Sequence, residues 1–207
     1  MAGFTGIAAV GTSLERLLSG AFLERQPIPS KLSKAGLIRT EDLADETLIK
    51  ARIGDLGLTL LLYRIDFNKT MRASGSGVGF ADGRSCLALD LHYLMTPWAD
   101  NAEHQHMIIG RAMQALERTP SLAGPTLYSP ILPLPEYATE PQAAVTDSVQ
   151  VLLEEISTEA LMRTFDSLPG DYRLSVPYVA RVVRIYTLET AVPPPVIDAN
   201  IRFRMAA

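Results

Sequence analysis

The sequence has a single cysteine, Cys86, and an aromatic content of only 7%. One thiol cannot form a disulfide within the chain, so a disulfide-stabilised fold is excluded and nothing indicates an oxidising compartment. The apolar stretch near the amino terminus is interrupted by Glu15 and Arg16 before it reaches a membrane-spanning length, and it lacks the basic flank of a signal peptide. These absences predict a cytoplasmic protein.

An excess of positive charge is absent as well. The chain carries 19 Lys and Arg residues against 23 Asp and Glu residues, which gives a formal net charge of −4. Such a balance offers no general attraction to a phosphate backbone or to an anionic lipid surface. We therefore expect neither nucleic acid nor a membrane among the partners.

The composition that is present is that of an ordinary folded domain, with 47% hydrophobic and 20% charged residues. The length of 207 residues corresponds to about 1.4 times a typical domain. We expect a single domain over residues 1–191, followed by a proline-rich carboxy-terminal tail over residues 192–207.

Apolar residues that recur at steps of three and four predict helices. The expected helices run from Gly6 to Leu23, from Asp100 or Asn101 to Arg118, and from a cap at Ser157 or Thr158 to Leu168. A capping box made by Thr12 and Glu15 leaves open a shorter first helix that starts at residue 13.

Apolar runs and strict alternation predict the strands. They are expected near residues 47–53 and over residues 58–67, 84–95, 149–155 and 171–188. The 58–67 strand is expected to be buried on both faces and to form a hairpin with 84–95. In the last strand the apolar parity changes after Val182, as at a β-bulge, and Pro177 predicts that part of this strand lies on an edge.

The remaining segments are expected to connect these elements. Residues 26–45 show no sustained period, and residues 121–146 form a proline-rich arm in which LYSPIL is the one short edge-strand candidate. Strands joined without crossovers, and helices that do not alternate with them, favour an α+β fold with a mainly antiparallel or mixed sheet flanked by helices.

Motifs that carry chemistry are scarce. The glycine-rich segment over residues 75–80 leads into a strand instead of a helix and has no Lys-Ser/Thr pair, so it does not fit a nucleotide-binding loop. His104 and His106 would point about 200° apart on a helix, which favours a polar helix start over a metal site. The sequence therefore predicts no cofactor and no metal.

A catalytic triad is the remaining chemical interpretation. Asp90 and His92 share one face of their predicted strand, but Ser85 lies on the opposite face and Cys86 is about 13 Å from Asp90. Glu154 and Glu155 end a predicted strand with one carboxylate on each face. A partly covered sheet face explains these residues more simply, and we predict no catalytic residues.

Two segments, taken as wholes, carry a family resemblance. The strand, loop and helix over residues 87–122 and the strand over residues 171–187 are similar to the corresponding parts of cap, or tail-terminator, proteins of phage-tail-like contractile injection systems. The opening helix and the run over residues 58–68 occupy the expected places. The resemblance is to the amino-terminal domain of that family and covers nearly the whole chain. The segments that carry it are LALDLHYLMTPWADNAEHQHMIIGRAMQALERTPSL and DYRLSVPYVARVVRIYT.

The resemblance implies a phage tail-terminator-like fold and a structural, non-enzymatic role. Such proteins form a ring, expected to be a hexamer, that closes the end of the inner tube and contacts the terminal layer of the sheath. The implied partners are further copies of the chain, the inner-tube protein and the sheath protein. Larger members continue into a further domain after the segment that corresponds to the PPP run.

Three segments are candidates for contacts between subunits or with the sheath, namely the glycine-rich hairpin tip, the proline-rich arm and the tail. The tail sequence ANIRF alternates apolar residues and would suit pairing with a partner strand. The candidate interface residues are Arg72, Phe80, Leu132, Ile197, Ile201 and Phe203.

Two alternatives remain open from the sequence. One is another ring or adaptor component of the same machine. The other belongs to a different class, a soluble enzyme that uses Asp90, His92 and neighbouring carboxylates.

Overall fold

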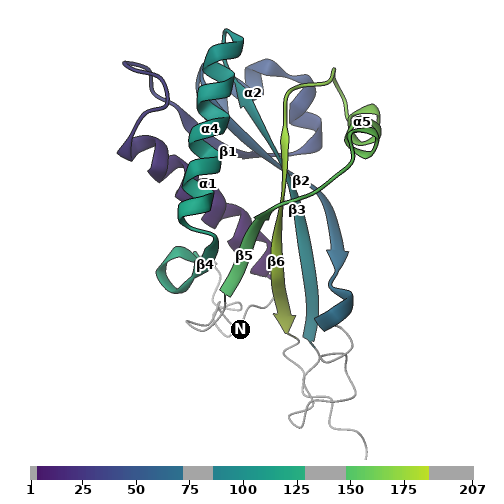
Figure 1. The fold of residues 1–207 in the computed structure, drawn as a ribbon. Coiled ribbons are helices and arrows are strands. Elements are labelled where there is room, and N and C mark those ends of the chain that lie inside the picture. Colours follow the sequence, from purple (N-terminus) through teal and green to yellow (C-terminus); the bar gives the residue numbers. More distant parts are fainter. Residues whose placement is uncertain (1–3, 72–85, 129–147, 187–207) are drawn as a thin grey trace, which may run out of the picture.

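The computed structural model describes residues 4–71, 86–128 and 148–186. Within them, six strands form one sheet in the order β1-β2-β3-β6-β5-β4 (Figure 1). β1 runs parallel to β2, and every other neighbouring pair is antiparallel, so the predicted α+β fold with a mainly antiparallel, mixed sheet is confirmed. The strands are β1 (Lys34–Ile38), β2 (Gly57–Phe67), β3 (Cys86–Trp98), β4 (Ser121–Ala123), β5 (Ser148–Leu153) and β6 (Val176–Tyr186).

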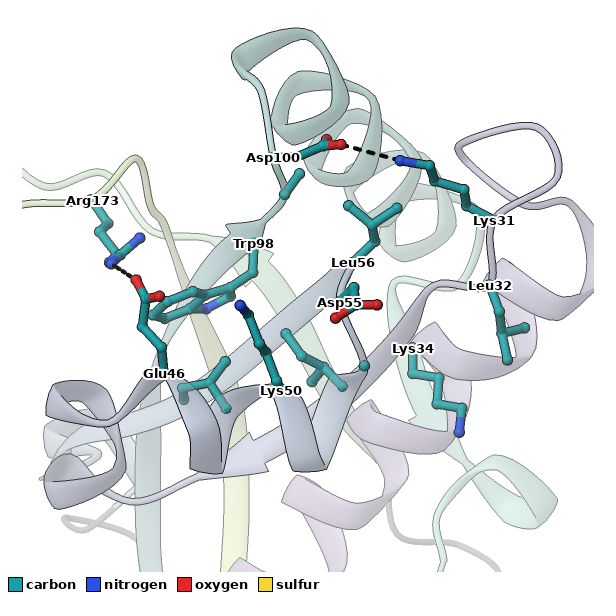
Figure 2. Close-up of a pocket in the computed structure, with 14 residues that line it drawn as sticks. Lys31, Leu32, Lys34, Glu46, Lys50, Asp55, Leu56, Trp98, Asp100 and Arg173 are labelled. Atoms are coloured by element: carbon teal, nitrogen blue, oxygen red, sulfur yellow. Dashed lines mark hydrogen bonds and ion pairs between the residues drawn. The ribbon is translucent and has the colours of Figure 1, made fainter.

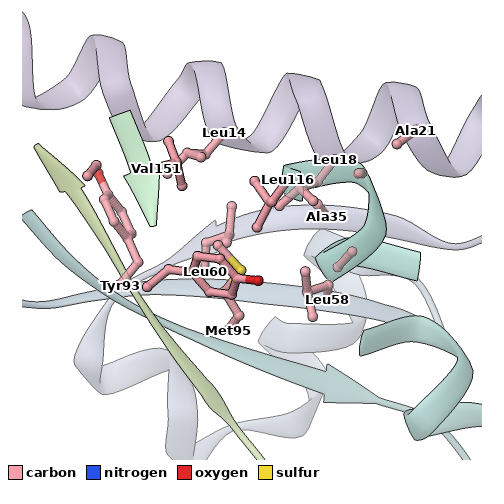
Figure 3. Close-up of a cluster of buried hydrophobic side chains, with 14 of the residues drawn as sticks. Leu14, Leu18, Ala21, Ala35, Leu58, Leu60, Tyr93, Met95, Leu116 and Val151 are labelled. Atoms are coloured by element: carbon pink, nitrogen blue, oxygen red, sulfur yellow. The ribbon is translucent and has the colours of Figure 1, made fainter. Parts of the chain in front are cut away.

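Helices cover both faces of the sheet. On one face α1 (Gly6–Glu24) and α4 (Ala102–Arg118) pack over the strands and enclose the main core, in which Leu14 and Leu18 meet Leu60 (Figure 3). On the other face α2 (Glu46–Ile53) and α5 (Thr158–Asp166) enclose a smaller core around Leu94. Because helices cover both faces, the strands in the middle of the sheet are buried on both sides and are therefore apolar on both sides.

The predicted helix positions of α1, α4 and α5 are confirmed. α1 starts at Gly6, so the shorter helix that Thr12 and Glu15 suggested is wrong. Asn101 caps α4 by accepting a hydrogen bond from the His104 backbone N–H at 2.8 Å, and the Ser157 hydroxyl caps α5 in the same way. Each cap satisfies an amide that the first turn of a helix leaves without a partner.

Two predictions between residues 26 and 53 are wrong. The segment expected to be a strand near 47–53 is the helix α2, which Asp45 caps through the backbone N–H groups of Thr47 and Leu48. The segment expected to be a connection contains the 3-10 turn Thr40–Ala44 and the strand β1. Two buried isoleucines four residues apart, Ile49 and Ile53, are too few to distinguish helix from strand by periodicity.

β1 depends on tertiary contacts that its five residues do not reveal. The Ser19 hydroxyl of α1 accepts a hydrogen bond from the Ala35 backbone N–H at 3.1 Å and donates one to the Ala35 carbonyl at 3.3 Å. Gly36 lies so close to α2 that a Cβ there would meet the Ile53 side chain at 2.9 Å. The two Ser19 hydrogen bonds satisfy the main-chain groups of Ala35 in an edge strand, where such groups are otherwise exposed.

β2 and β3 pair antiparallel as predicted, and a register shift between Leu62 and Arg64 marks a bulge in β2. The expectation that β2 is buried on both faces is correct for its first half only. Leu58 and Leu60 are fully buried, whereas Ile65 and Phe67 are 46% and 47% exposed. The far ends of β2, β3 and β6 extend beyond the helices (Figure 1), which is why the burial ends there.

β6 confirms both the predicted bulge and the predicted partial edge at Pro177. Leu89 pairs with Val183 and Leu91 with Ala180, so β6 has one more residue than β3 between these pairs. β6 lies between β3 and β5, but among the described residues β5 pairs only with residues 178–181, so the prediction that part of the strand, at Pro177, lies on an edge is correct. Pro177 is tolerated because it precedes the stretch paired with β5, where a missing N–H breaks no ladder.

Several predicted features lie outside the described residues. They are the hairpin tip with its glycine-rich segment, most of the proline-rich arm and the tail that follows residue 191. Residues 129–132 of LYSPIL also lie outside. The first part of the arm forms β4 and the short 3-10 helix Gly124–Thr126.

Candidate functional site

A cavity of about 780 Å³ opens between α2, the segment before β1 and the carboxyl end of β3 (Figure 2). Ile49 and Ile53 from α2 and Leu56 lie beneath its surface, and each of these side chains is at most 4% exposed. Leu32, which is 57% exposed, stands on the rim. Seven of the 14 lining residues are charged, and the exposed Leu32 offers an apolar contact beside them.

Trp98 forms the wall of this cavity next to α2. Its indole N–H donates to the Thr59 hydroxyl at 2.9 Å, which orients the ring. The guanidinium of Arg173 lies 4.1 Å from the centre of the Trp98 ring and donates to the Glu46 carboxylate at 2.9 Å. A cation over an aromatic face is attractive, and the carboxylate holds the cation in place.

The charges around the cavity divide into paired and unpaired groups. Two ion pairs close opposite sides of the mouth, Lys31 with Asp100 at 3.1 Å and Arg173 with Glu46 at 2.9 Å (Figure 2). The other charged lining residues make no ion pair with any residue that the structure describes. These residues are Lys34, Lys50 and Asp55, so the cavity keeps a small excess of positive charge.

Asp100 joins the cavity to the first turn of α4. Its carboxylate lies 2.6 Å from His104 Nδ1 and accepts from Lys31, and these two hydrogen bonds lower the pKa of Asp100 to about 2. His104 is thereby tied to the helix start, and no group of three possible metal ligands lies together among residues 4–71, 86–128 and 148–186. The two histidines considered for a metal therefore find no third ligand in this part of the chain.

A polar cluster lies on the α2 and α5 face of the sheet, where β5 ends. The bulge in β2 turns both Tyr63 and Arg64 toward Glu154, and these two side chains donate to its carboxylate at 3.2 Å and 2.9 Å. His92 Nδ1 lies 2.9 Å from the same carboxylate, and His92 Nε2 lies 3.3 Å from Asp66. A bulge often changes the direction of a side chain in this way.

This cluster attaches the segment that links β5 and α5 to the hairpin β2–β3. His92 and Glu154 are almost buried, with side chains 8% and 13% exposed, while Arg64 is 43% exposed. Burial raises the pKa of Tyr63 to about 12, and the neighbouring charge of Glu154 acts in the same direction. The polar groups satisfy one another, as partly buried polar groups must if they are not to destabilise the fold.

The structure separates the residues that a triad would need. Asp90 shares the face of His92, but its carboxylate accepts from the Asn68 amide at 3.0 Å and 3.2 Å. Cys86 pairs across the sheet with Tyr186, six residues along β3 from His92 and thus about 20 Å away. Ser85 lies outside the described residues. Cys86 is therefore not placed beside Asp90 and His92 as a triad would require, whereas His92 does meet the carboxylates of Glu154 and Asp66.

Sequence reasoning noted His92 and Glu154 separately and missed Tyr63, Arg64 and the cavity. The bulge in β2 that turns Tyr63 and Arg64 toward Glu154 had no sequence signal comparable with the parity change in β6. For α2, the sequence did contain a usable signal, because Asp45 is a good helix cap and Gly54, at φ 78°, is a good helix end.

Replacing Glu154 by alanine is expected to lower the free energy of unfolding by about 2 kcal/mol. The change would leave the partly buried donors of Tyr63 and Arg64 without their acceptor. Urea denaturation followed by circular dichroism measures the effect. Glu155→Ala is the matched control because Glu155 is exposed, and it is expected to change stability by no more than about 0.5 kcal/mol. Equal effects of the two substitutions would contradict the assigned role of Glu154.

The six candidate interface residues lie outside the described ranges, so the structure places none of them. They are Arg72, Phe80, Leu132, Ile197, Ile201 and Phe203. Within the described ranges, no helix combines the length and the apolar character that crossing a membrane requires.

Fold and site together define an α+β structural domain, a mixed sheet between two helical layers with a charged cavity at one end. Among the described residues, no hydrogen bond joins a serine, threonine or cysteine side chain to a histidine. The chain belongs to the family described as the Pvc16 N-terminal domain, which matches residues 9–198. Among curated proteins, none matches the sequence.

Two solved structures have a similar fold. One is the sheath/tube terminator of PVC, an extracellular contractile injection system, in the extended state, with a TM-score of 0.50 and 17% identity over 97% of this chain. The other is the tube-terminating cap of the anti-feeding prophage, AFP, with a TM-score of 0.52 and 18% identity over 94% of this chain. The chain spans 65% and 60% of the lengths of these two proteins. At identities this low, the structural similarity shows a common fold and nothing further.

Proposed function

We propose that this chain is a structural cap subunit of a contractile injection system, which closes the end of the inner tube and contacts the last layer of the sheath. The observation that carries the proposal is the agreement of family and fold: the family match covers residues 9–198, and both similar structures are terminators. The proposed partners are accordingly the inner-tube protein, the sheath protein and further copies of this chain.

The proposal includes a hexameric ring without enzymatic activity, cofactor or metal. A ring requires two different surfaces on each copy that fit one another. The net charge of −4 supports protein partners for this ring, because it suits them better than nucleic acid or a membrane. We propose synthesis in the cytoplasm, followed by assembly into the particle.

The tail over residues 192–207 is proposed to contact neighbouring subunits or the sheath, while residues 1–191 form the domain. The candidate residues Ile197, Ile201 and Phe203 belong to the tail. An alternating apolar sequence of this kind suits main-chain pairing with a partner strand.

Deleting the gene from a strain that produces the injection system tests the role directly. Without the chain, we expect tubes of variable length whose ends lack cap density in electron micrographs, and full-length chain should restore uniform, capped particles. A chain without residues 193–207 should melt at nearly the same temperature as the full chain but fail to cap particles. Normal particle length and firing in the gene-deletion strain would overturn the cap assignment, and capping by the shortened chain would overturn the role of the tail.

A further inference from the structure

We propose that the cavity of Figure 2 receives the β5 edge of the neighbouring copy, so that these two surfaces form the contact between subunits of the ring. The inference rests on the proposed function because it names the interface of the proposed ring. The key residues are Lys34 and Lys50 at the cavity, and Leu153 and Glu117 at the β5 edge.

The β5 edge has an exposed apolar side chain next to an unpaired acid. Leu153, at the end of β5, is 56% exposed, the third highest value among the large hydrophobic side chains that the structure describes as exposed. It lines a shallow groove of about 420 Å³ together with Met113 and Glu117 of α4. Glu117 is exposed and makes no ion pair with any described residue.

β5 is also incompletely covered by its outer neighbour. β4 pairs only with residues 148–150, and the Val151 backbone N–H donates to the Pro120 carbonyl at 2.8 Å. Leu153 lies beyond the residues paired with β4, so it pairs with β6 on one side and with no described strand on the other. An apolar side chain at an open strand edge is a surface that proteins normally cover.

The cavity has the complementary chemistry. Leu32 on its rim, 57% exposed, offers an apolar contact, and 780 Å³ is ample space for a leucine. Lys34 and Lys50 stand at the mouth without an ion-pair partner among the described residues. Leu153 would thus pack against Leu32 while Glu117 approaches the two free ammonium groups.

The positions of the two surfaces suit a ring. Asp100, on the cavity, precedes α4, and Glu117 lies near the other end of the same helix, so the surfaces are separated by about 25 Å at the rise of an α-helix. Two different surfaces at separate places on one subunit make a head-to-tail contact. Such contacts close into rings when the rotation between copies allows it. A second copy of this chain is therefore the occupant of the cavity.

Cysteine cross-linking in assembled particles tests this contact. In a Cys86→Ser background, the double variant Lys50→Cys and Glu117→Cys is expected to give a ladder of linked copies under mild oxidation. Each single-cysteine variant should stay unlinked, and the two single variants expressed together should give dimers and nothing larger. The double variant Glu41→Cys and Glu159→Cys, at two side chains that are 76% and 75% exposed, controls for random collision.

Charge reversal provides a second measurement on the same particles. Lys50→Glu and Glu117→Lys are each expected to reduce the fraction of capped tube ends about tenfold, and the two together should restore it to within about twofold of wild type. If wild-type chain is found in particles but the paired cysteines give no ladder, or one cysteine alone gives dimers, the inference is wrong while the cap function stands. If wild-type chain is absent from particles, the proposed function fails and this interface fails with it.

Discussion

Replacing Phe22 by alanine is expected to lower the free energy of unfolding by about 3 to 5 kcal/mol. Phe22 is completely buried in the main core, on the face of α1 that packs against the sheet. Removing the ring withdraws its transfer free energy and leaves a cavity that the surrounding strands can fill only in part. The midpoint of denaturation in guanidinium chloride, at unchanged slope, measures this loss.

The neighbouring residue provides the control. Leu23 is 71% exposed although it follows Phe22 directly in the same helix, so Leu23→Ala should change stability by no more than about 0.5 kcal/mol. A large effect of Leu23→Ala in the isolated chain, or a small effect of Phe22→Ala, would mean that the face of α1 assigned to the core is wrong.

The second large effect is expected at Gly57, the first residue of β2. A Cβ at this position would collide with the Lys34 carbonyl oxygen and would lie 2.9 Å from Ile53 Cβ. Gly57→Ala must therefore separate β1 from β2 and displace α2, and we expect it to cost about 3 kcal/mol. Because Lys34 and Ile53 also line the cavity, the substitution should disturb the cavity as well.

Gly20→Ala is the matched substitution for Gly57→Ala. Gly20 lies within α1, is exposed and has no atom within 4 Å of an added Cβ. Alanine there should stabilise the protein by about 0.5 to 1 kcal/mol, because glycine loses more backbone entropy when a helix forms. Thermal denaturation of both variants measures the contrast. Similar melting temperatures would contradict the close approach of β1 and β2.

The elements that the sequence predicted well are long or have strong local signals. α1 and α4 each bury a continuous stripe over several turns, and Asn101 marks the start of α4. The paired strands β2 and β3 follow from adjacent apolar runs. α2 was missed because it is short and buries only two residues, so the cap at Asp45 is its main local signal. β1 was missed because it has only five residues and is stabilised by a hydrogen bond with Ser19 of α1.

The candidate site was accessible to sequence reasoning only in fragments. His92 and Glu154 were noted, but their meeting depends on Arg64 and on the bulge in β2, which lie far from Glu154 in the chain. The cavity depends on Trp98, the last residue of β3, and on Arg173, which lies in the segment before β6 and is distant from Trp98 in the sequence. No residue pattern within a short window reports such a meeting.

The sequence by itself determined the α+β class, three of the helices, the hairpin, the bulge in β6 and the resemblance to a cap family. These properties depend on local periodicity, on capping residues and on the order of segments along the chain. Only the tertiary structure decided that β6 lies between β3 and β5, that residues 46–53 are helical and that a charged cavity and an exposed Leu153 lie at separate places on one subunit. The reason is that each of these depends on contacts between residues distant in sequence, whose free energies appear only when the chain is packed.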